Sequence, residues 1–134
     1  TRAVIAIKKG NELSKRFAYD SEGRLAEISD PYGYQIYRKY DQRSRLTSIS
    51  DADGGFTYYY NERDEIVKIS SPVGDVNYDF DEVGNLTGIK DANGNKTKLE
   101  YDENYKLIAL IDAEGGMTRY EYNDFHCLTK IILP

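Results

Sequence analysis

An aromatic residue followed by Asp or Asn recurs six times in this chain at nearly constant spacing. Successive pairs are 21, 20, 20, 21 and 21 residues apart, at Tyr19-Asp20, Tyr40-Asp41, Tyr60-Asn61, Phe80-Asp81, Tyr101-Asp102 and Tyr122-Asn123. A repeat of this length restricts the chain to architectures in which one small supersecondary unit stacks on the next.

Other columns keep the same register. An aliphatic residue lies six residues after each aromatic, at Leu25, Leu46, Ile66, Leu86, Leu107 and Leu128. Another lies nine residues after it, at Ile28, Ile49, Ile69, Ile89, Leu110 and Ile131. Because this three-residue spacing is odd, a regular strand would place the two residues on opposite faces. Either a bulge resets the register or both faces are partly covered.

Each repeat also contains two Asp-x-x-Gly-like tetrads, so a turn signal occurs about every ten residues. Asp, Asn or Ser at the first position accepts a hydrogen bond from the backbone two residues on, and Gly at the fourth takes a positive φ. Pro31 and Pro72 occupy second positions, where proline fits. The predicted structural turn residues are Asp20, Gly23, Asp30, Gly33, Asp41, Asp51, Gly54, Gly74, Asp81, Gly84, Asp91, Gly94, Asp102, Asp112 and Gly115.

The segments between turns are about six residues long and rich in Tyr, Ile, Leu, Val and Thr, which is typical of strands. Strands joined by tight turns pair antiparallel, so the sequence predicts an all-β, antiparallel β-meander of hairpins with about ten or eleven strands. Twist should make so long a sheet curl or spiral. A closed barrel is the alternative, but closure fixes the strand number whereas a repeat can be extended.

The repeat predicts one array over residues 1–134. Full repeats are expected at 19–39, 40–59, 60–79, 80–100 and 101–121, with partial repeats at 1–18 and 122–134.

The net charge, the cysteine count and the lengths of the apolar runs argue against several classes of protein. The net charge of −5 argues against a nucleic-acid partner, and the single Cys127 excludes an internal disulfide. No apolar run approaches the ~18 residues of a membrane span, and no signal peptide is recognised. Because the first residue is Thr1, we expect a processed, excised or expressed fragment.

The stretch DADGGF at residues 51–56 resembles half of a calcium loop. An EF-hand loop requires Gly at position 6 and a bidentate Glu at position 12, whereas this stretch has Gly at position 4 and Phe56 at position 6. The hairpin-turn interpretation is therefore favoured over a metal site. We expect no metal and no cofactor.

Catalytic candidates are few. His126 and Cys127 are adjacent, but neighbouring strand residues point to opposite faces, which disfavours a catalytic pair. The glycines are spaced too widely for a phosphate-binding loop. We therefore expect no catalytic residues.

The thirteen tyrosines allow two interpretations. Cross-strand aromatic ladders would stabilise the sheet. Rings not needed for packing could instead stack on sugars, and Tyr34, Tyr37 and Tyr59 are the candidates for this role.

The units FAYDSEGRLAEISDPYGY, FDEVGNLTGIKDANGNKTKLEYD and YDENYKLIALIDAEGGMTRYEYN resemble the YD repeats of the Rhs family, over roughly Phe17 to Pro134. This family also includes bacterial wall-associated proteins, toxin-complex C components and teneurins. The resemblance implies β-hairpin ribbons that spiral into a hollow shell, which encloses a toxic domain in bacterial toxins and supports adhesion domains in teneurins. It also implies an aspartyl self-cleaving core in some members and a link with carbohydrate binding.

This chain differs from whole members of the family. It has about six units and no toxin domain. Asp30-Pro31-Tyr32-Gly33 is similar to the self-cleaving core motif, but it lies in the second turn column and is interpreted as an ordinary turn.

The leading hypothesis is a non-enzymatic structural module, a piece of scaffold or shell wall from a larger secreted or cell-surface protein of the toxin encapsulation or delivery type. The alternative is a carbohydrate-binding or cell-adhesion module, and a hydrolase or self-cleaving core is a third possibility. The expected partners are neighbouring repeats of a parent chain, other copies through edge strands, and glycans, without nucleic acid or membrane insertion.

Overall fold

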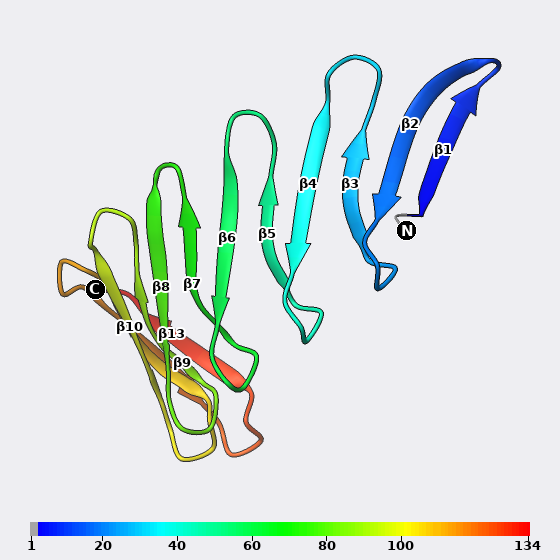
Figure 1. The fold of residues 1–134 in the computed structure, drawn as a ribbon. Coiled ribbons are helices and arrows are strands. Elements are labelled where there is room, and N and C mark those ends of the chain that lie inside the picture. The colour runs from blue at the N-terminus through cyan, green and yellow to red at the C-terminus, as the bar shows by residue number, and fades with distance from the viewer. Residues whose placement is uncertain (1–2) are drawn as a thin grey trace. The chain divides into compact units, whose positions relative to one another are not determined.

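The computed structural model describes residues 3–134 as thirteen antiparallel strands, and this part of the chain contains no helix. The strands lie in the sheet in chain order, so the predicted all-β meander is confirmed (Figure 1). Their bounds are β1 Val4–Lys9, β2 Glu12–Tyr19, β3 Leu25–Ser29, β4 Gln35–Tyr40, β5 Leu46–Ser50, β6 Gly55–Tyr60, β7 Ile66–Ser71, β8 Gly74–Phe80, β9 Leu86–Lys90, β10 Lys96–Tyr101, β11 Leu107–Ile111, β12 Met117–Tyr122 and β13 Leu128–Ile132.

The predicted count of ten or eleven strands was wrong. The segment that precedes the first Tyr-Asp pair forms a whole hairpin, β1 and β2, joined at Gly10 and Asn11. Gly10 has φ 67°, which suits glycine in so tight a turn. This hairpin lacks an Asp-x-x-Gly tetrad, which is the signal from which strands were counted.

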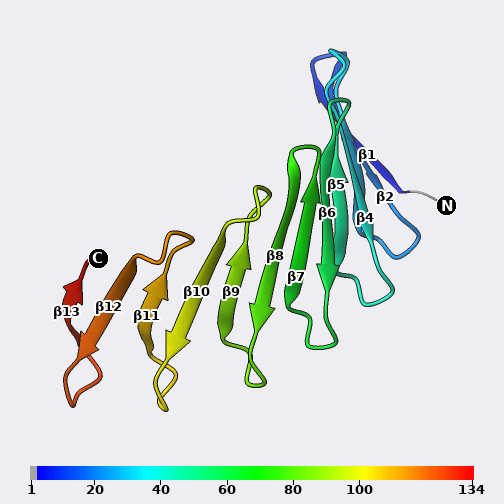
Figure 2. The same cartoon turned by 90° about the vertical axis from the view of Figure 1, so that its left-hand side faces the viewer.

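The chain forms two compact units. One holds the residues up to Tyr59 together with Ser70–Pro72, and the other holds Tyr60–Ile69 and Val73–Pro134. Within each unit, consecutive strands form successive hairpins, as the labelled ribbons show (Figures 1 and 2).

A bulge at the start of β3, β5, β9, β11 and β13 explains the odd spacing of the Leu and Ile columns. In the β2–β3 pair, Phe17 lies opposite Ile28 and Tyr19 lies opposite Leu25, and the register shifts between them. The extra residue is Ala26, so Leu25 and Ile28 share a face with the aromatic residues. The pairs β4–β5, β8–β9, β10–β11 and β12–β13 have the same shift.

The small variation in repeat length arises in the second turn of each repeat. Five residues separate β3 from β4, β9 from β10 and β11 from β12. Four residues separate β5 from β6, and only Pro72 and Val73 separate β7 from β8. The Tyr-Asp turns all have five residues, so this turn type is constant whereas the other tolerates change.

The core is thin because each unit is a single layer of strands. The described residues that are fully buried and apolar are all alanines, Ala18, Ala26 and Ala109. The accessible area is 9591 Å², whereas a compact protein of this mass is expected to expose about 7,200 Å². We call the side of the sheet that carries the aromatic column and the two aliphatic columns the Tyr/Leu/Ile face. Its large side chains are half-buried against those of neighbouring strands. The curl expected of so long a meander stays a prediction.

Candidate functional site: the Tyr-Asp turns and an apolar groove

All six Tyr-Asp turns have the same hydrogen bonds. The side-chain Oδ1 of the Asp or Asn accepts from the backbone N–H groups two and four residues on, at 2.8–3.1 Å. In the first turn these donors are Glu22 and Arg24, and the Asp20 N–H donates to the Arg24 carbonyl. One side-chain oxygen thus satisfies two backbone donors that the hairpin leaves unpaired.

The second turns are less uniform. Asp30, Asp91 and Asp112 each accept the same two bonds, at 2.7–3.0 Å. Asp51 lies in the four-residue turn, and the structure shows one such bond, from the Asp53 N–H at 3.0 Å.

The fourth residue of every Tyr-Asp turn has a left-handed backbone. Gly23 and Gly84 have φ of 79° and 96°. Four turns place another residue there, with φ between 60° and 66°, namely Ser44, Asp64, Tyr105 and His126. The sequence analysis predicted a positive φ only for glycines. The other four residues align with Gly23 and Gly84 in the repeat, so the same backbone could have been predicted for them.

Hydrogen bonds lower the pKa of several turn carboxyls. The Asn85 side-chain amide donates to Asp81 Oδ2 at 2.8 Å, and this bond is the main cause that holds the pKa of Asp81 below 3.8. For Asp20, burial acts to raise the pKa, but hydrogen bonds from the Arg24 backbone and guanidinium outweigh it and lower the pKa. The pKa is lowered in the same direction for Asp41, Asp91 and Asp102.

Side chains connect three of the Tyr-Asp turns to the turn of the next repeat. Arg24 pairs with Asp20 in its own turn, with Nε and Oδ2 at 2.7 Å. Its Nη1 then donates to the Asp41 carbonyl at 2.9 Å and to Ser44 Oγ at 3.2 Å. The guanidinium lies 4.9 Å from the centroid of the Tyr40 ring, within the range of a cation–π contact.

The second unit has equivalent contacts. Lys106 pairs with Asp102 at 3.3 Å, lies 5.2 Å from the Tyr122 ring centroid, and donates to His126 Nδ1 at 2.9 Å. Arg63 likewise donates to the Asp81 carbonyl at 2.6 Å and to the Glu82 carbonyl. Different residue types therefore make the same link between neighbouring turns.

The repeated tyrosine hydroxyl reaches the preceding hairpin. Tyr101 Oη donates to the Leu86 carbonyl at 2.8 Å, and burial followed by the charge of Asp81 raises the pKa of Tyr101. Tyr40 and Tyr122 make the same bond to Leu25 and Leu107, at 2.9 and 2.8 Å. This contact explains the preference for Tyr in the column, which sequence reasoning did not explain.

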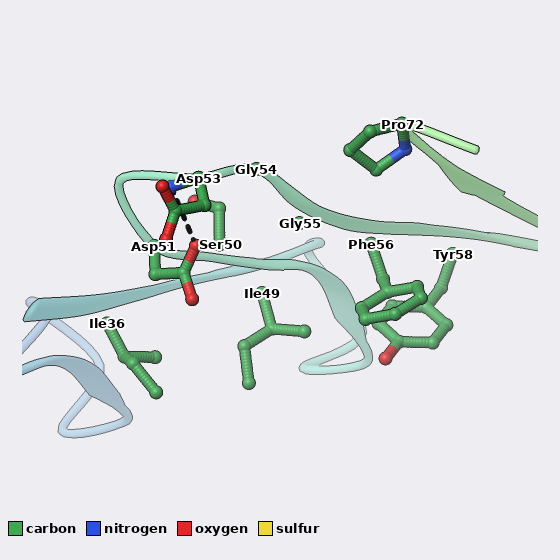
Figure 3. A pocket seen from close by; sticks show the side chains of 10 residues that line it. All are labelled: Ile36, Ile49, Ser50, Asp51, Asp53, Gly54, Gly55, Phe56, Tyr58 and Pro72. Carbon is green, nitrogen blue, oxygen red and sulfur yellow. Dashed lines mark hydrogen bonds between the residues drawn. The ribbon is translucent and has the colours of Figure 1, made fainter. Parts of the chain in front are cut away.

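An open apolar groove lies at the second-turn end of the first unit (Figure 3). It has a volume of about 500 Å³, and its lining includes Ile36, Ile49, Phe56 and Tyr58 on the Tyr/Leu/Ile face. Pro72 borders it where it approaches Gly54, because a Cβ on that glycine would lie 2.6 Å from the proline Cγ. The sequence analysis did not predict the groove. The signal was present, because Gly54 and Gly55 followed by an aromatic residue, Phe56, occur in this repeat alone.

The predicted sugar-stacking tyrosines do not form one platform. Tyr37 and Tyr59 are 40% and 47% exposed, but Tyr37 lies level with Ser50, which pairs with Gly55. Tyr59 is four residues further along β6, about 13 Å along the strands. Tyr34 lies in the turn that precedes β4.

The catalytic and metal candidates lie in turns. Asp30 accepts the two turn bonds described above, and Cys127 is exposed, with its backbone N–H bonded to Asn123. Over residues 3–134, no group of three or more His, Cys, Asp or Glu side chains is arranged to hold a metal ion. The same residues include no helix that could span a membrane.

Comparisons with known proteins agree with the repeat. Residues 80–117 match the family model for the RHS repeat. The comparison with curated proteins found no match.

Several solved structures share the fold. The chain is similar to one in the crystal structure of TcdB2-TccC3-Cdc42, with 13% identity and a TM-score of 0.70 over 90% of this chain and 7% of that one. It is similar to a chain of the Photorhabdus luminescens Tc holotoxin pore, with 17% identity and a TM-score of 0.75 over 97% and 9%. A third match is TcdB2-TccC3 without its hypervariable C-terminal region, with 17% identity and a TM-score of 0.73 over 99% and 9%.

The chain thus spans less than a tenth of the length of these solved chains. The six Tyr-Asp columns extend the repeat on both sides of the matched residues 80–117, and each Tyr-Asp turn has the same hydrogen bonds. The chain is therefore similar to the RHS repeat over residues 80–117, and its fold is similar to that of sections of these solved chains.

Proposed function

We propose that the chain is a non-enzymatic section of repeat wall in a larger secreted or cell-surface protein. The observation that carries this proposal is the link from one Tyr-Asp turn to the next, which Arg24, Arg63 and Lys106 make at three places in the array. Each of these links ends on the Tyr-Asp turn of the next repeat, and the hydroxyls of Tyr40, Tyr101 and Tyr122, which share one column of the repeat, bond to the preceding hairpin. Columns of this kind are typical of a scaffold that can be extended.

The kind of parent protein follows from the fold relatives. The similar chains are named as parts of a Tc holotoxin pore and of TcdB2-TccC3 assemblies. By this analogy the wall belongs to a toxin encapsulation or delivery protein, and its partners are the repeats on either side. In isolation the chain should also pair with other copies through its edge strands.

Lengthening the array by one repeat tests the proposal that the chain is a section of repeat wall. A second copy of residues 80–100 is inserted after Glu100, which keeps every Tyr-Asp column in register. The longer chain should fold and should be more stable towards urea than the parent chain, because one more neighbour interface is present. A longer chain that is unfolded or less stable would contradict the proposal.

The self-cleaving alternative has its own test, which is mass spectrometry of purified chain during storage. We expect an intact chain both for the parent sequence and for Asp30→Asn. Cleavage that Asp30→Asn prevents would establish a catalytic role and refute the non-enzymatic proposal.

Carbohydrate binding is the second candidate function, and the half-exposed rings of Tyr34, Tyr37 and Tyr59 favour it. A glycan array probed with and without calcium tests it. Because these rings do not share one platform, we expect no hits, whereas hits that Tyr37→Ala or Tyr59→Ala removes would favour the adhesion module.

A further inference from the structure

The groove of the first unit differs from the equivalent place in other repeats. Phe56 occupies the column that holds Ile36, Thr97 and Thr118 in other repeats, and Phe56 is 49% exposed. Gly55 follows the short second turn, and a Cβ there would collide with the Ile49 carbonyl. The local backbone therefore requires glycine, and the groove is open beside a ring that the sheet does not bury.

The floor of the groove is apolar. Ile49 pairs with Phe56 across β5 and β6, and Ile36 and Tyr58 extend the surface on either side (Figure 3). Sugar hydroxyls placed on isoleucine side chains would lose hydrogen bonds to water without replacement. An aromatic or aliphatic body fits this floor better than a sugar does.

The rim of the groove is acidic. Asp51 and Asp53 lie together at its turn end (Figure 3). Asp51 Oδ1 accepts the Asp53 N–H within the turn, whereas the Asp53 carboxylate makes no ion pair with any described residue. The basic side chain nearest in register is Arg38, which lies directly opposite Ile49 on β4 but is not among the residues that line the groove.

We propose that this groove binds small amphipathic cations, with an aromatic or aliphatic body on Ile49 and Phe56 and an ammonium or amidinium group at Asp53. The apolar floor contributes contact area, and the carboxylate selects the charge. A volume of about 500 Å³ accommodates a body the size of one benzene ring. The site is separate from the turn contacts that support the wall.

The test is a titration of the full chain with benzylammonium chloride, followed by amide chemical shifts. We expect saturable shifts at Gly54, Gly55 and Phe56, with a dissociation constant on the order of millimolar. The equivalent amides of Gly94, Lys96 and Thr97 serve as an internal control and should not shift. Benzyl alcohol, a neutral molecule of the same shape, should bind about threefold more weakly.

Two variants separate what the Asp53 charge and the Phe56 ring each contribute to binding. Asp53→Asn introduces the residue that Asn93 provides in another repeat, and should weaken binding about threefold. Phe56→Thr introduces the residue of Thr97, and should weaken it about fivefold or more. If Phe56→Thr does not fold, Asp53→Asn and the neutral molecule still test the site.

The proposal is overturned by any of three results. These are equal binding of benzyl alcohol and benzylammonium, unchanged binding by Asp53→Asn, or equal shifts at Gly94 to Thr97. Saturable shifts with methyl glucoside in the absence of shifts with benzylammonium would also overturn it, because they would assign the groove to sugars.

Discussion

At the scale of single residues, the Tyr-Asp turn is defined by an acceptor at its first position and a left-handed backbone at its fourth. The acceptor is an Asp or Asn oxygen in all six turns, but the left-handed residue varies in type. Ser44 and His126 use their side chains to contact the preceding turn, which gives a reason for a non-glycine residue there. Tyr105 is different, because its ring is 61% exposed.

Tyr105→Gly should therefore stabilise the chain. An L-residue at φ 60° is strained, and glycine relieves the strain at some cost in unfolded-state entropy, so the expected gain is about 0.5–1 kcal/mol. Urea denaturation measures it. The matched control is Gly23→Ala, where no atom lies within 4 Å of the new Cβ, and it should destabilise by about 1 kcal/mol. A loss of stability in Tyr105→Gly would mean that the ring makes a stabilising contact.

Tyr101→Phe should destabilise the chain by about 1 kcal/mol, because it removes the hydroxyl that donates to the Leu86 carbonyl. Phe80 fills the same column without a hydroxyl, so the change is compatible with the fold. Thermal unfolding checks this, with Tyr120→Phe as a control in the neighbouring column, where the expected change is close to zero. Equal effects of the two substitutions would show that the hydroxyl bond adds nothing to stability.

At the scale of strands, the bulge decides which face each side chain occupies. The extra residue between Leu86 and Gly88 in β9 is Thr87, whose Oγ1 donates to the Asp79 carbonyl at 3.2 Å. Without the bulge, Leu86 and Ile89 would lie on opposite faces. The bulge is thus the reason that two aliphatic columns with odd spacing cover one row of aromatic rings.

Deletion of Thr87 should destabilise the chain by about 3 kcal/mol or more, because a one-residue slip moves an aliphatic side chain to the polar face. Thr87→Ala keeps the bulge and removes one hydrogen bond, so it should cost only about 0.5–1 kcal/mol. Urea denaturation of the two variants compares them. Similar effects would contradict the role assigned to the bulge.

Much of this organisation was predictable from the sequence. The Asp columns predicted the turn positions, and the hydrophobic segments predicted most strands. The bulge could not be chosen from sequence, because odd spacing fits either a bulge or two covered faces. The links made by Arg24 and Lys106 could not be predicted either, because they join residues about 20 positions apart whose side-chain directions depend on the turn. The groove depends on a contact between Gly54 and Pro72 that no local pattern encodes.

At the scale of the whole chain, stability rests on contacts between neighbours because no large side chain is fully buried among the described residues. The turn carboxylates are part of these contacts. Five of them have a lowered pKa in the folded state, so the folded chain holds their protons less tightly than the unfolded chain does.

The stability of the chain should therefore depend on acid pH. The contribution of these carboxylates is complete above the ordinary Asp pKa of 3.8 and is lost as the pH falls through the lowered values. Thermal unfolding between pH 6 and pH 2 should show a midpoint that is steady down to about pH 4 and then falls. Asp81→Asn, which matches the Asn61 and Asn123 turns, should reduce the fall. A midpoint independent of pH over this range would contradict the prediction.

The central claim is that the chain is a wall of interchangeable repeats, each held by its neighbours. The most direct measurement is urea unfolding of a chain that lacks residues 80–100, a deletion that joins Asp79 to Tyr101 and keeps the Tyr-Asp columns in register. We predict a folded β-sheet protein whose free energy of unfolding and urea dependence are both reduced in a graded way. Complete loss of the folded state would contradict the claim, because it would mean that the array folds only as one closed, indivisible structure.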